Sequence, residues 1–406
     1  MSAIDQILGT SAREREALAA RIARHLPPPL IDVFNPDVMC SHLLFDELVH
    51  RLTLNVCAES GLAEAASDWG TVDEMVARSG FDPGPATAAV GSILRHLATR
   101  GVLARQEAAG GPRFRAEHEL PVLDPAVVRA EQQRHDPACL PSYVIAETAA
   151  RDYPAFLRGK RSGEDILLAP TRLPLWVAYF SNGNLLYAVN NRVGAVAVEA
   201  WMPPAVGAIL EIGGGCASGT SALLERLATV GRLGDVARYR FTELVPAFLR
   251  RGQRNVEERF SAASCLSFEP LDMNRPFGEQ GIARASVSIV YAVNTLHVAH
   301  DFAFTLAEVR RVLEPGGQLI ISECVRPFPG QTLYPEFVFN LMATFRAPKL
   351  HPEYRPNGGF LTTGQWASAL EAAGFVDVRV LPDIASIRDV FPTFYAAAIG
   401  ATRGTA

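Results

Sequence analysis

The spacing of apolar residues differs between two parts of the chain. Up to about residue 165, apolar positions recur mainly at helical spacing, as in residues 42–66 and 84–103. Thr71, followed by Glu74 three residues later, predicts a capping box at the start of another helix. Residues 103–117 contain a Gly-Gly-Pro turn and predict a β-hairpin. The order of helix, helix and hairpin is typical of a winged helix.

From about residue 205 onward, short apolar runs alternate with helical patterns. The runs that predict strands are residues 208–215, 238–245, 267–273, 287–294 and 317–324, with two more in the tail that could pair as an antiparallel hairpin. Residues 300–317 predict an amphipathic helix that Pro315 and two glycines end. Alternation of this kind indicates an α/β fold. We expect a Rossmann-like, mostly parallel sheet of seven strands in residues 166–406, after a mainly helical, winged-helix-like domain in residues 1–165.

Composition narrows the class of protein. The chain has 406 residues, of which 49% are apolar. Its net charge is −5, so it has no overall electrostatic attraction to nucleic acid or anionic lipid. Its N-terminus lacks the apolar core of a signal peptide, and no apolar run is long enough for a membrane span. The six cysteines include no C-x-x-C pair and are expected to be reduced thiols. We expect a cytoplasmic protein that does not bind membranes.

A glycine-rich turn follows the first strand of the second part, in "LEIGGGCASGT" (210–220). Glu211 closes the strand, and Gly213 and Gly215 permit a tight turn with close backbone approach of a ligand. The phosphate-binding pattern G-x-G-x-x-G does not fit, because Ser218 stands where its third glycine belongs. Ligand binding without a pyrophosphate cradle is therefore indicated.

Polar residues at the next three strand ends complete a nucleoside pocket. Glu243 ends the second strand, where a carboxylate can accept both ribose hydroxyls. Asp272 follows the third strand, within reach of an adenine amino group, and Asn294 ends the fourth. Each has a structural alternative, since Glu243 could be a surface acid on a loop, Asp272 could cap a helix and Asn294 could bond the backbone at its strand end.

These segments, in their order, resemble the class I S-adenosylmethionine-dependent methyltransferases. The runs "FTELVPAFL" and "NTLH" are most similar to methyltransferase domains of polyketide synthases, whereas the first part resembles the dimerising domain of small-molecule O-methyltransferases. The resemblance implies S-adenosylmethionine as cofactor, S-adenosylhomocysteine as product and a homodimer. It also adds Thr220 and Met273 to the cofactor site. Ala217 departs from the family's G-x-G-x-G turn, and we expect cofactor binding to tolerate it.

The candidate catalytic base is His297, just past the fourth strand. A histidine near neutral pKa suits removal of a proton from a hydroxyl or an activated C–H group. Glu323, at the end of the neighbouring strand, would orient the imidazole, and both families that the chain resembles use such a pair. His300 is better explained by capping or solvent exposure. A metal site from His297, His300 or Asp301, and His351 is disfavoured, because the spacing matches no ligand pattern.

The acceptor is harder to predict. Two aromatic stretches, 173–192 and 334–360, are candidates for the walls of its pocket, although ordinary core packing explains any single residue as well. The residues proposed for the pocket are Trp176, Tyr179, Phe180, Phe337, Met342 and His351. We expect methylation of a polyketide-like or aromatic specialised metabolite, with oxygen slightly favoured. The alternative is an activated carbon of a β-keto or carrier-tethered acyl group.

A winged helix also raises the alternative of a DNA-binding regulator. Residues 71–120 hold six basic and six acidic residues, so this segment offers no net positive charge to DNA phosphates. We therefore expect a small-molecule or carrier-bound partner and no nucleic acid.

Overall fold

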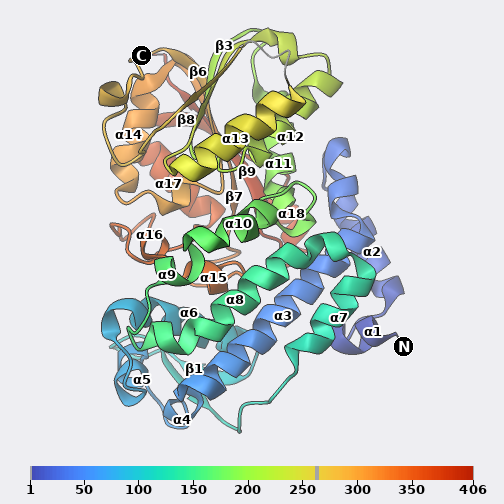
Figure 1. Ribbon diagram of the computed structural model, residues 1–406, viewed down its shortest axis with the longest axis vertical. Coiled ribbons are helices and arrows are strands. Elements are labelled where there is room, and N and C mark those ends of the chain that lie inside the picture. Colours follow the sequence, from blue (N-terminus) through green and yellow to red (C-terminus); the bar gives the residue numbers. More distant parts are fainter. Residues whose placement is uncertain (1, 261–264, 406) are drawn as a thin grey trace. The chain divides into compact units, whose positions relative to one another are not determined.

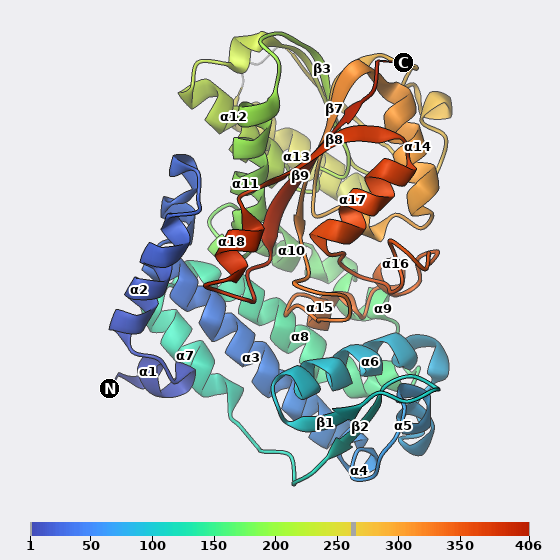
Figure 2. The same cartoon turned by 180° about the vertical axis from the view of Figure 1, so that it is seen from behind.

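The computed structural model describes residues 2–260 and 265–405, which form two compact units. The first comprises residues 2–17, 36–179 and 328–347, and the second comprises 18–35, 180–327 and 348–405. This division differs from the predicted boundary after residue 165, because the first unit continues to Tyr179 and takes up a segment from far along the chain. Figures 1 and 2 show the elements of both units.

The first unit is mainly helical, as predicted. Its long helix α3 (Pro36–Ser60) packs along α7 (Pro125–His135) and α8 (Leu140–Leu157). The predicted capping box is confirmed, because Thr71 and Glu74 exchange the two expected hydrogen bonds at the start of α5 (Val72–Arg78). The other elements are α1 (Ala3–Leu8), α4 (Leu62–Ala65), α6 (Pro83–Thr99), β1 (Leu103–Gln106), β2 (Arg113–Ala116), α9 (Gly163–Leu167), α10 (Leu173–Tyr179), α15 (Glu336–Phe339) and α16 (Ala343–Arg346), while α2 (Ala12–Ala23) spans the division between the units.

Two features of the first unit bear on the sequence predictions. Helices α5 and α6 are followed by the antiparallel pair β1–β2, which is the predicted order of helix, helix and hairpin. The stretch after the hairpin contains four prolines between residues 121 and 141, and most of it from residue 125 onward is helical. Pro125 occupies the first turn of α7 and the Asp124 side chain accepts from the Ala126 N–H. Proline is tolerated there because the first amides of a helix have no intrahelical acceptor.

The second unit is a seven-stranded sheet of order β5-β4-β3-β6-β7-β9-β8. The pairs from β5 to β7 are parallel, and β9 is antiparallel to both β7 and β8. The antiparallel pairing of β8 with β9 agrees with the tail pattern. Helices α11 and α12 cover one face and α14 and α17 the other (Figures 1 and 2). The strands are β3 (Val206–Glu211), β4 (Val236–Thr242), β5 (Leu266–Glu269), β6 (Val287–Val293), β7 (Leu313–Cys324), β8 (Phe375–Leu381) and β9 (Ala396–Arg403). The helices are α11 (Leu185–Trp201), α12 (Ser218–Thr229), α13 (Pro246–Arg259), α14 (Phe302–Val312), α17 (Thr363–Ala372) and α18 (Ile384–Arg388).

Strand β6 forms the centre of the core, and all seven of its residues are buried. One boundary differs from the prediction: α14 ends at Val312, and β7 begins at Leu313, before Pro315 rather than after it. Pairing of Leu313 with Val287 stabilises this first part of β7. A shift in register between Val287 and Ile289 separates this pair from the rest of the β6–β7 ladder. Within residues 2–260 and 265–405, no helix is both long and apolar enough to span a bilayer.

Candidate functional site

The strand order reverses between β3 and β6, and this is where parallel sheets bind ligands, beyond the carboxyl ends of the strands. The polar residues predicted at these ends stand where expected. Glu211 is the last residue of β3, Glu243 follows β4 directly, and Asn294 follows β6. Because Ser322 pairs with Val293, Glu323 of β7 lies next to the end of β6. Four neighbouring strands thus contribute to one edge of the sheet.

The glycine turn after β3 is closed on one side and open on the other. A Cβ at Gly213 would lie 2.4 Å from the Thr295 side chain, and one at Gly214 would lie 2.1 Å from the Phe241 ring. At Gly215, where φ is +57°, a Cβ would meet nothing within 4 Å. Ala217 adopts the left-handed conformation, with φ of 66°, which costs a non-glycine residue about 1 kcal/mol. The alanine therefore has the backbone geometry that would favour glycine.

Glu243 joins the end of β4 to this turn. One carboxylate oxygen accepts from the Gly215 N–H at 2.9 Å and the other from the Val245 N–H at 2.8 Å. Burial raises the pKa of Glu243, while these backbone hydrogen bonds oppose the rise. Each oxygen keeps a further lone pair that can accept a hydrogen bond from a hydroxyl group.

Glu211 and Thr220, both predicted as cofactor ligands, lie buried beneath the turn. The Thr220 hydroxyl donates to Glu211 at 2.5 Å, and the Tyr239 hydroxyl donates to the same oxygen at 2.8 Å. Burial raises the pKa of Glu211 to about 7. The geometry favours a role in which this pair supports the turn from below.

The pKa of Glu211 predicts a pH-dependent stability that a Glu211→Gln variant should lack. The carboxyl group has its ordinary pKa of 4.5 in the unfolded chain and about 7 in the folded one, so folding favours its protonated form. Its contribution is complete below pH 4.5 and is lost as the pH rises to about 7. We expect the wild type to lose roughly 3 kcal/mol relative to Glu211→Gln across that window. Urea unfolding at several pH values measures the difference, and parallel curves for the two proteins would contradict it.

The loop after β5 holds Asp272 and Met273. One carboxylate oxygen of Asp272 accepts from the backbone and side-chain N–H groups of Asn274, at 2.9 and 3.2 Å. The Met273 carbonyl accepts from the Thr305 hydroxyl at 3.0 Å. Both residues are half-buried. The loop is thus held by its own bonds, and Asp272 keeps its second carboxylate oxygen outside them.

Asn294 occupies the left-handed region with φ of 49° and bonds two neighbours. Its side-chain oxygen accepts from the Cys324 N–H at 3.1 Å and from the Asn190 amide at 2.9 Å. This matches the structural alternative of backbone satisfaction at the strand end. It also introduces Asn190, a residue that the sequence reasoning missed.

Asn190 and Asn191 of α11 are almost completely buried, and each has a side-chain oxygen without a hydrogen-bond partner among the described residues. The Asn191 oxygen lies 3.6 Å from the position that a Cβ at Gly219 would take, and a Glu211 oxygen lies 3.3 Å from the same position. Both acceptor oxygens thus lie close to Gly219, in the first turn of α12. The signal in the sequence was the doublet itself, two asparagines inside the mostly apolar "LLYAVNNRVGAV".

The predicted pair of His297 and Glu323 is in direct contact. The imidazole Nδ1 lies 2.8 Å from a Glu323 carboxylate oxygen, and both side chains are buried. The other oxygen of Glu323 accepts from the Thr295 N–H at 3.1 Å and, more weakly, from the His297 N–H at 3.4 Å. A carboxylate on Nδ1 places the donor hydrogen of a neutral imidazole there, so Nε2 is the basic nitrogen.

The rival candidates next to His297 have other surroundings. His300 is exposed, and its N–H donates to the Asn274 side chain at 2.8 Å. Asp301 caps α14 by accepting from the Phe304 N–H. His351 stacks on Tyr354 with ring centroids 3.8 Å apart. No group of three histidine, cysteine or acidic side chains suited to a metal occurs in the described part of the chain.

The residues predicted for the acceptor pocket are divided between the units. Trp176, Tyr179, Phe337 and Met342 belong to the first, whereas Phe180 and His351 belong to the second. Trp176 packs against Tyr179 and stacks on Phe339, with its indole N–H donating to the Leu167 carbonyl. Phe180 contacts Tyr187 and Phe248 in the second unit. Within each unit these contacts are also those of ordinary packing.

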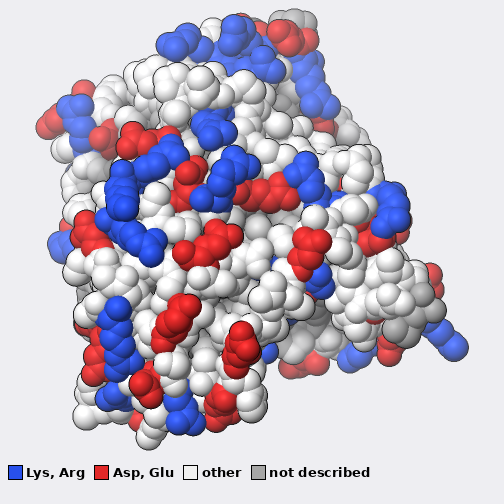
Figure 3. Space-filling model, turned by 60° about the horizontal axis from the view of Figure 1, so that its bottom comes forward, with Lys and Arg blue, Asp and Glu red and all other residues white. Residues whose placement is uncertain are grey.

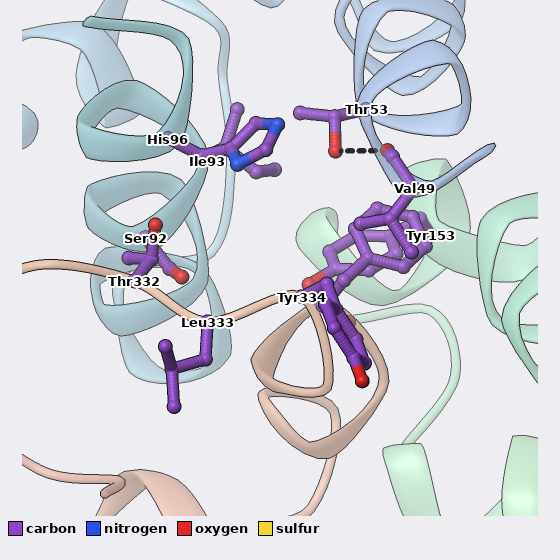
Figure 4. A pocket seen from close by; sticks show the side chains of 10 residues that line it. Val49, Thr53, Ser92, Ile93, His96, Tyr153, Thr332, Leu333 and Tyr334 are labelled. Carbon is purple, nitrogen blue, oxygen red and sulfur yellow. Dashed lines mark hydrogen bonds between the residues drawn. The ribbon is translucent and has the colours of Figure 1, made fainter. Parts of the chain in front are cut away.

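Phe337 lines a cavity in the first unit, among α3, α6 and α8 (Figure 4). Polar groups face it from several sides, including Thr53, Ser92 and His96. Its volume is only about 10 Å³, enough for about one water molecule. A metabolite does not fit, so this cavity is not an acceptor site.

Known proteins resemble the chain in sequence and in fold. Residues 210–319 match the family described as "Methyltransferase domain". The chain is 27% identical over 235 residues to the highly reducing polyketide synthase frbB of Dothideomycetidae sp. (strain 11243), an alignment that covers 58% of this chain and 8% of that synthase. The chain spans less than a tenth of the length of the first curated relatives that it matches.

Two solved structures have the same fold over nearly their whole length. The CurJ carbon methyltransferase superposes with a TM-score of 0.72 at 20% identity, covering 99% of this chain and 98% of that one. The DszA carbon methyltransferase gives a TM-score of 0.70 at 23% identity, with 96% of each chain covered. The predicted fold class and the resemblance to domains of polyketide synthases are confirmed.

Proposed function

We propose that this chain, whose residues 210–319 match a methyltransferase domain, methylates the carbon between the two carbonyl groups of a β-keto acyl substrate. The methyl donor in this proposal is S-adenosylmethionine. The observation that supports the proposal is the contact between His297 and Glu323 at the edge of the sheet, which suits an oriented base.

The residues at this edge fit the proposed cofactor. The open side of the turn at Gly215 admits close approach, and Glu243 offers lone pairs to two ribose hydroxyls. The unpartnered oxygen of Asn191 lies near Gly219 in the helix that follows the turn, and a hydrogen-bond acceptor there suits the ammonium group of the methionine tail. When bound, S-adenosylmethionine supplies an electrophilic methyl group on a sulfonium centre.

The chain's own residues supply the base. A carbon flanked by two carbonyl groups is acidic, and Nε2 of His297 takes its proton, so the electron pair of the broken C–H bond becomes available for the new C–C bond. Glu323 holds the imidazole through Nδ1 and stabilises the imidazolium that forms. The proton then leaves His297 to solvent.

Carbon is now favoured over oxygen, which reverses the slight preference drawn from the sequence. The curated relatives are named as polyketide synthases or hybrid synthetases, and the two superposed structures are named as carbon methyltransferases. Polyketide synthases build β-keto acyl chains on carrier domains, so a carrier-bound acyl thioester is the proposed form of the acceptor.

The product distinguishes carbon from oxygen methylation. The protein would be incubated with ¹³C-methyl S-adenosylmethionine and an acetoacetyl thioester, either of N-acetylcysteamine or of a carrier protein, with a simple phenol in parallel. The proposal predicts a ¹³C methyl signal bonded to carbon, from the thioester alone. A methoxy signal from either acceptor, or no product from both thioesters, would overturn it.

A DNA-binding role is less well supported by the charges of the first unit. Five of the six basic residues in residues 71–120 lie within 4.0 Å of a carboxylate oxygen, namely Arg78, Arg100, Arg105, Arg113 and Arg115. On the face shown in Figure 3, basic and acidic side chains are intermingled. Arginines paired in this way are poorly placed to neutralise phosphates.

A further inference from the structure

The turn that carries His297 is supported by a segment more than fifty residues further along the chain. We call residues 349–360 the supporting segment. The N–H of Lys349 donates to the His300 carbonyl at 2.7 Å, and its ammonium group pairs with Asp301 at 2.8 Å. At the other end of the segment, the Phe360 ring lies 4.5 Å from the His297 imidazole, centroid to centroid.

Arg355 makes the central contact of this segment. One guanidinium nitrogen donates to the carbonyl oxygen of His297 at 2.5 Å, and the other terminal nitrogen donates to that of Ala299 at 2.6 Å. The guanidinium also lies over the Phe302 ring, 5.4 Å from its centroid. The side chain is only 1% exposed. The planar guanidinium of one side chain thus binds the carbonyl of His297, within the turn Leu296–Val298, and that of Ala299, which follows this turn.

Packing alone does not explain a buried arginine at position 355. Burial of a cation is unfavourable unless it is paired, and no carboxylate lies within ion-pair distance of Arg355 among the described residues. Its Nε is also buried without a hydrogen-bond partner. The nearest acid in the turn, Asp301, pairs with Lys349 instead. An apolar side chain of similar volume would fill this position at a lower desolvation cost, but it would form a hydrogen bond with neither carbonyl.

We propose that Arg355 is a positioning residue for the base: it fixes the backbone of His297 so that the imidazole keeps Nδ1 on Glu323 and presents Nε2 to the acceptor. The inference rests on the proposed role of His297. Arginine suits this task because its planar fork donates to both carbonyls at once, whereas lysine is a point donor.

Two variants separate the geometry from the charge. Arg355→Lys keeps the cation, and Arg355→Met keeps most of the volume without it. We expect both to lower kcat by about 10- to 100-fold, because a base displaced by about an ångström loses that much. KM for the acceptor thioester and the affinity for S-adenosylhomocysteine should stay within about twofold of wild type.

Arg388 provides a matched control. It is also partly buried and donates to two backbone carbonyls, those of Phe394 and Val325, but it does not contact the turn of His297. Arg388→Met should change kcat by less than about threefold at similar loss of thermal stability. If Arg388→Met and Arg355→Met lower kcat equally, or if Arg355→Lys keeps full activity, the positioning role is overturned. The wild-type product tests the proposed function independently, so either idea can fail alone.

Discussion

His297→Gln should lower kcat by about 10²- to 10⁴-fold while leaving the affinity for S-adenosylhomocysteine within about twofold of wild type. The imidazole is the base in the proposed mechanism, so its loss removes proton transfer. Glutamine can still donate to Glu323, which otherwise would remain buried beside an empty space. Single-turnover kinetics and calorimetric titration measure the two quantities separately.

His300→Gln is the matched control for that substitution. This histidine lies three residues further on, is exposed, and bonds Asn274 only through its backbone N–H. We expect its kcat to stay within about threefold of wild type. A large loss in His300→Gln, with normal turnover in His297→Gln, would exchange the roles of the two histidines.

Glu243→Gln should weaken S-adenosylhomocysteine binding by about 10- to 100-fold, because hydrogen bonds to a charged acceptor are worth about 1.5–3 kcal/mol. The same loss should appear with 5′-methylthioadenosine, which keeps the ribose and adenine but lacks the amino-acid tail. Calorimetric titration with both ligands is the measurement. Unchanged affinity for either ligand would exclude the ribose role of Glu243.

Asn191→Leu is the complementary variant in that experiment. Leucine has a similar shape but removes the acceptor oxygen that lies near Gly219. We expect a loss of affinity for S-adenosylhomocysteine and none for 5′-methylthioadenosine. The two variants together therefore distinguish the ribose contact from the tail contact. An equal loss with both ligands in Asn191→Leu would mean that the substitution disturbs the turn itself.

The strands and the residues at their ends were predictable because their signals are local. Apolar runs such as residues 287–294 must be buried in a parallel sheet, and a polar residue directly after such a run lies at the ligand-binding edge. The order β4-β3-β6-β7 in the sheet then places Glu243, Glu211, Asn294 and Glu323 at the ends of adjacent strands. The contact between His297 and Glu323 follows from that topology.

The substrate-facing residues were less predictable. Aromatic residues such as Trp176 and Phe337 have the same sequence signature in a pocket as in a core, and the structure divides the proposed set between two units. The cavity that Phe337 lines is too small for a metabolite. Aromatic composition indicates burial, but it does not indicate against what the ring is buried.

The sequence by itself determined the class of fold, the glycine turn and the pair of residues proposed for proton transfer, because each depends on short patterns and on strand order. Only the tertiary structure decided which residues support them. Arg355 reaches His297 across 58 positions, and Asn190 reaches Asn294 across 104. No periodicity links such positions, since the free energy of these contacts arises only when the folded chain brings a buried donor to a buried acceptor.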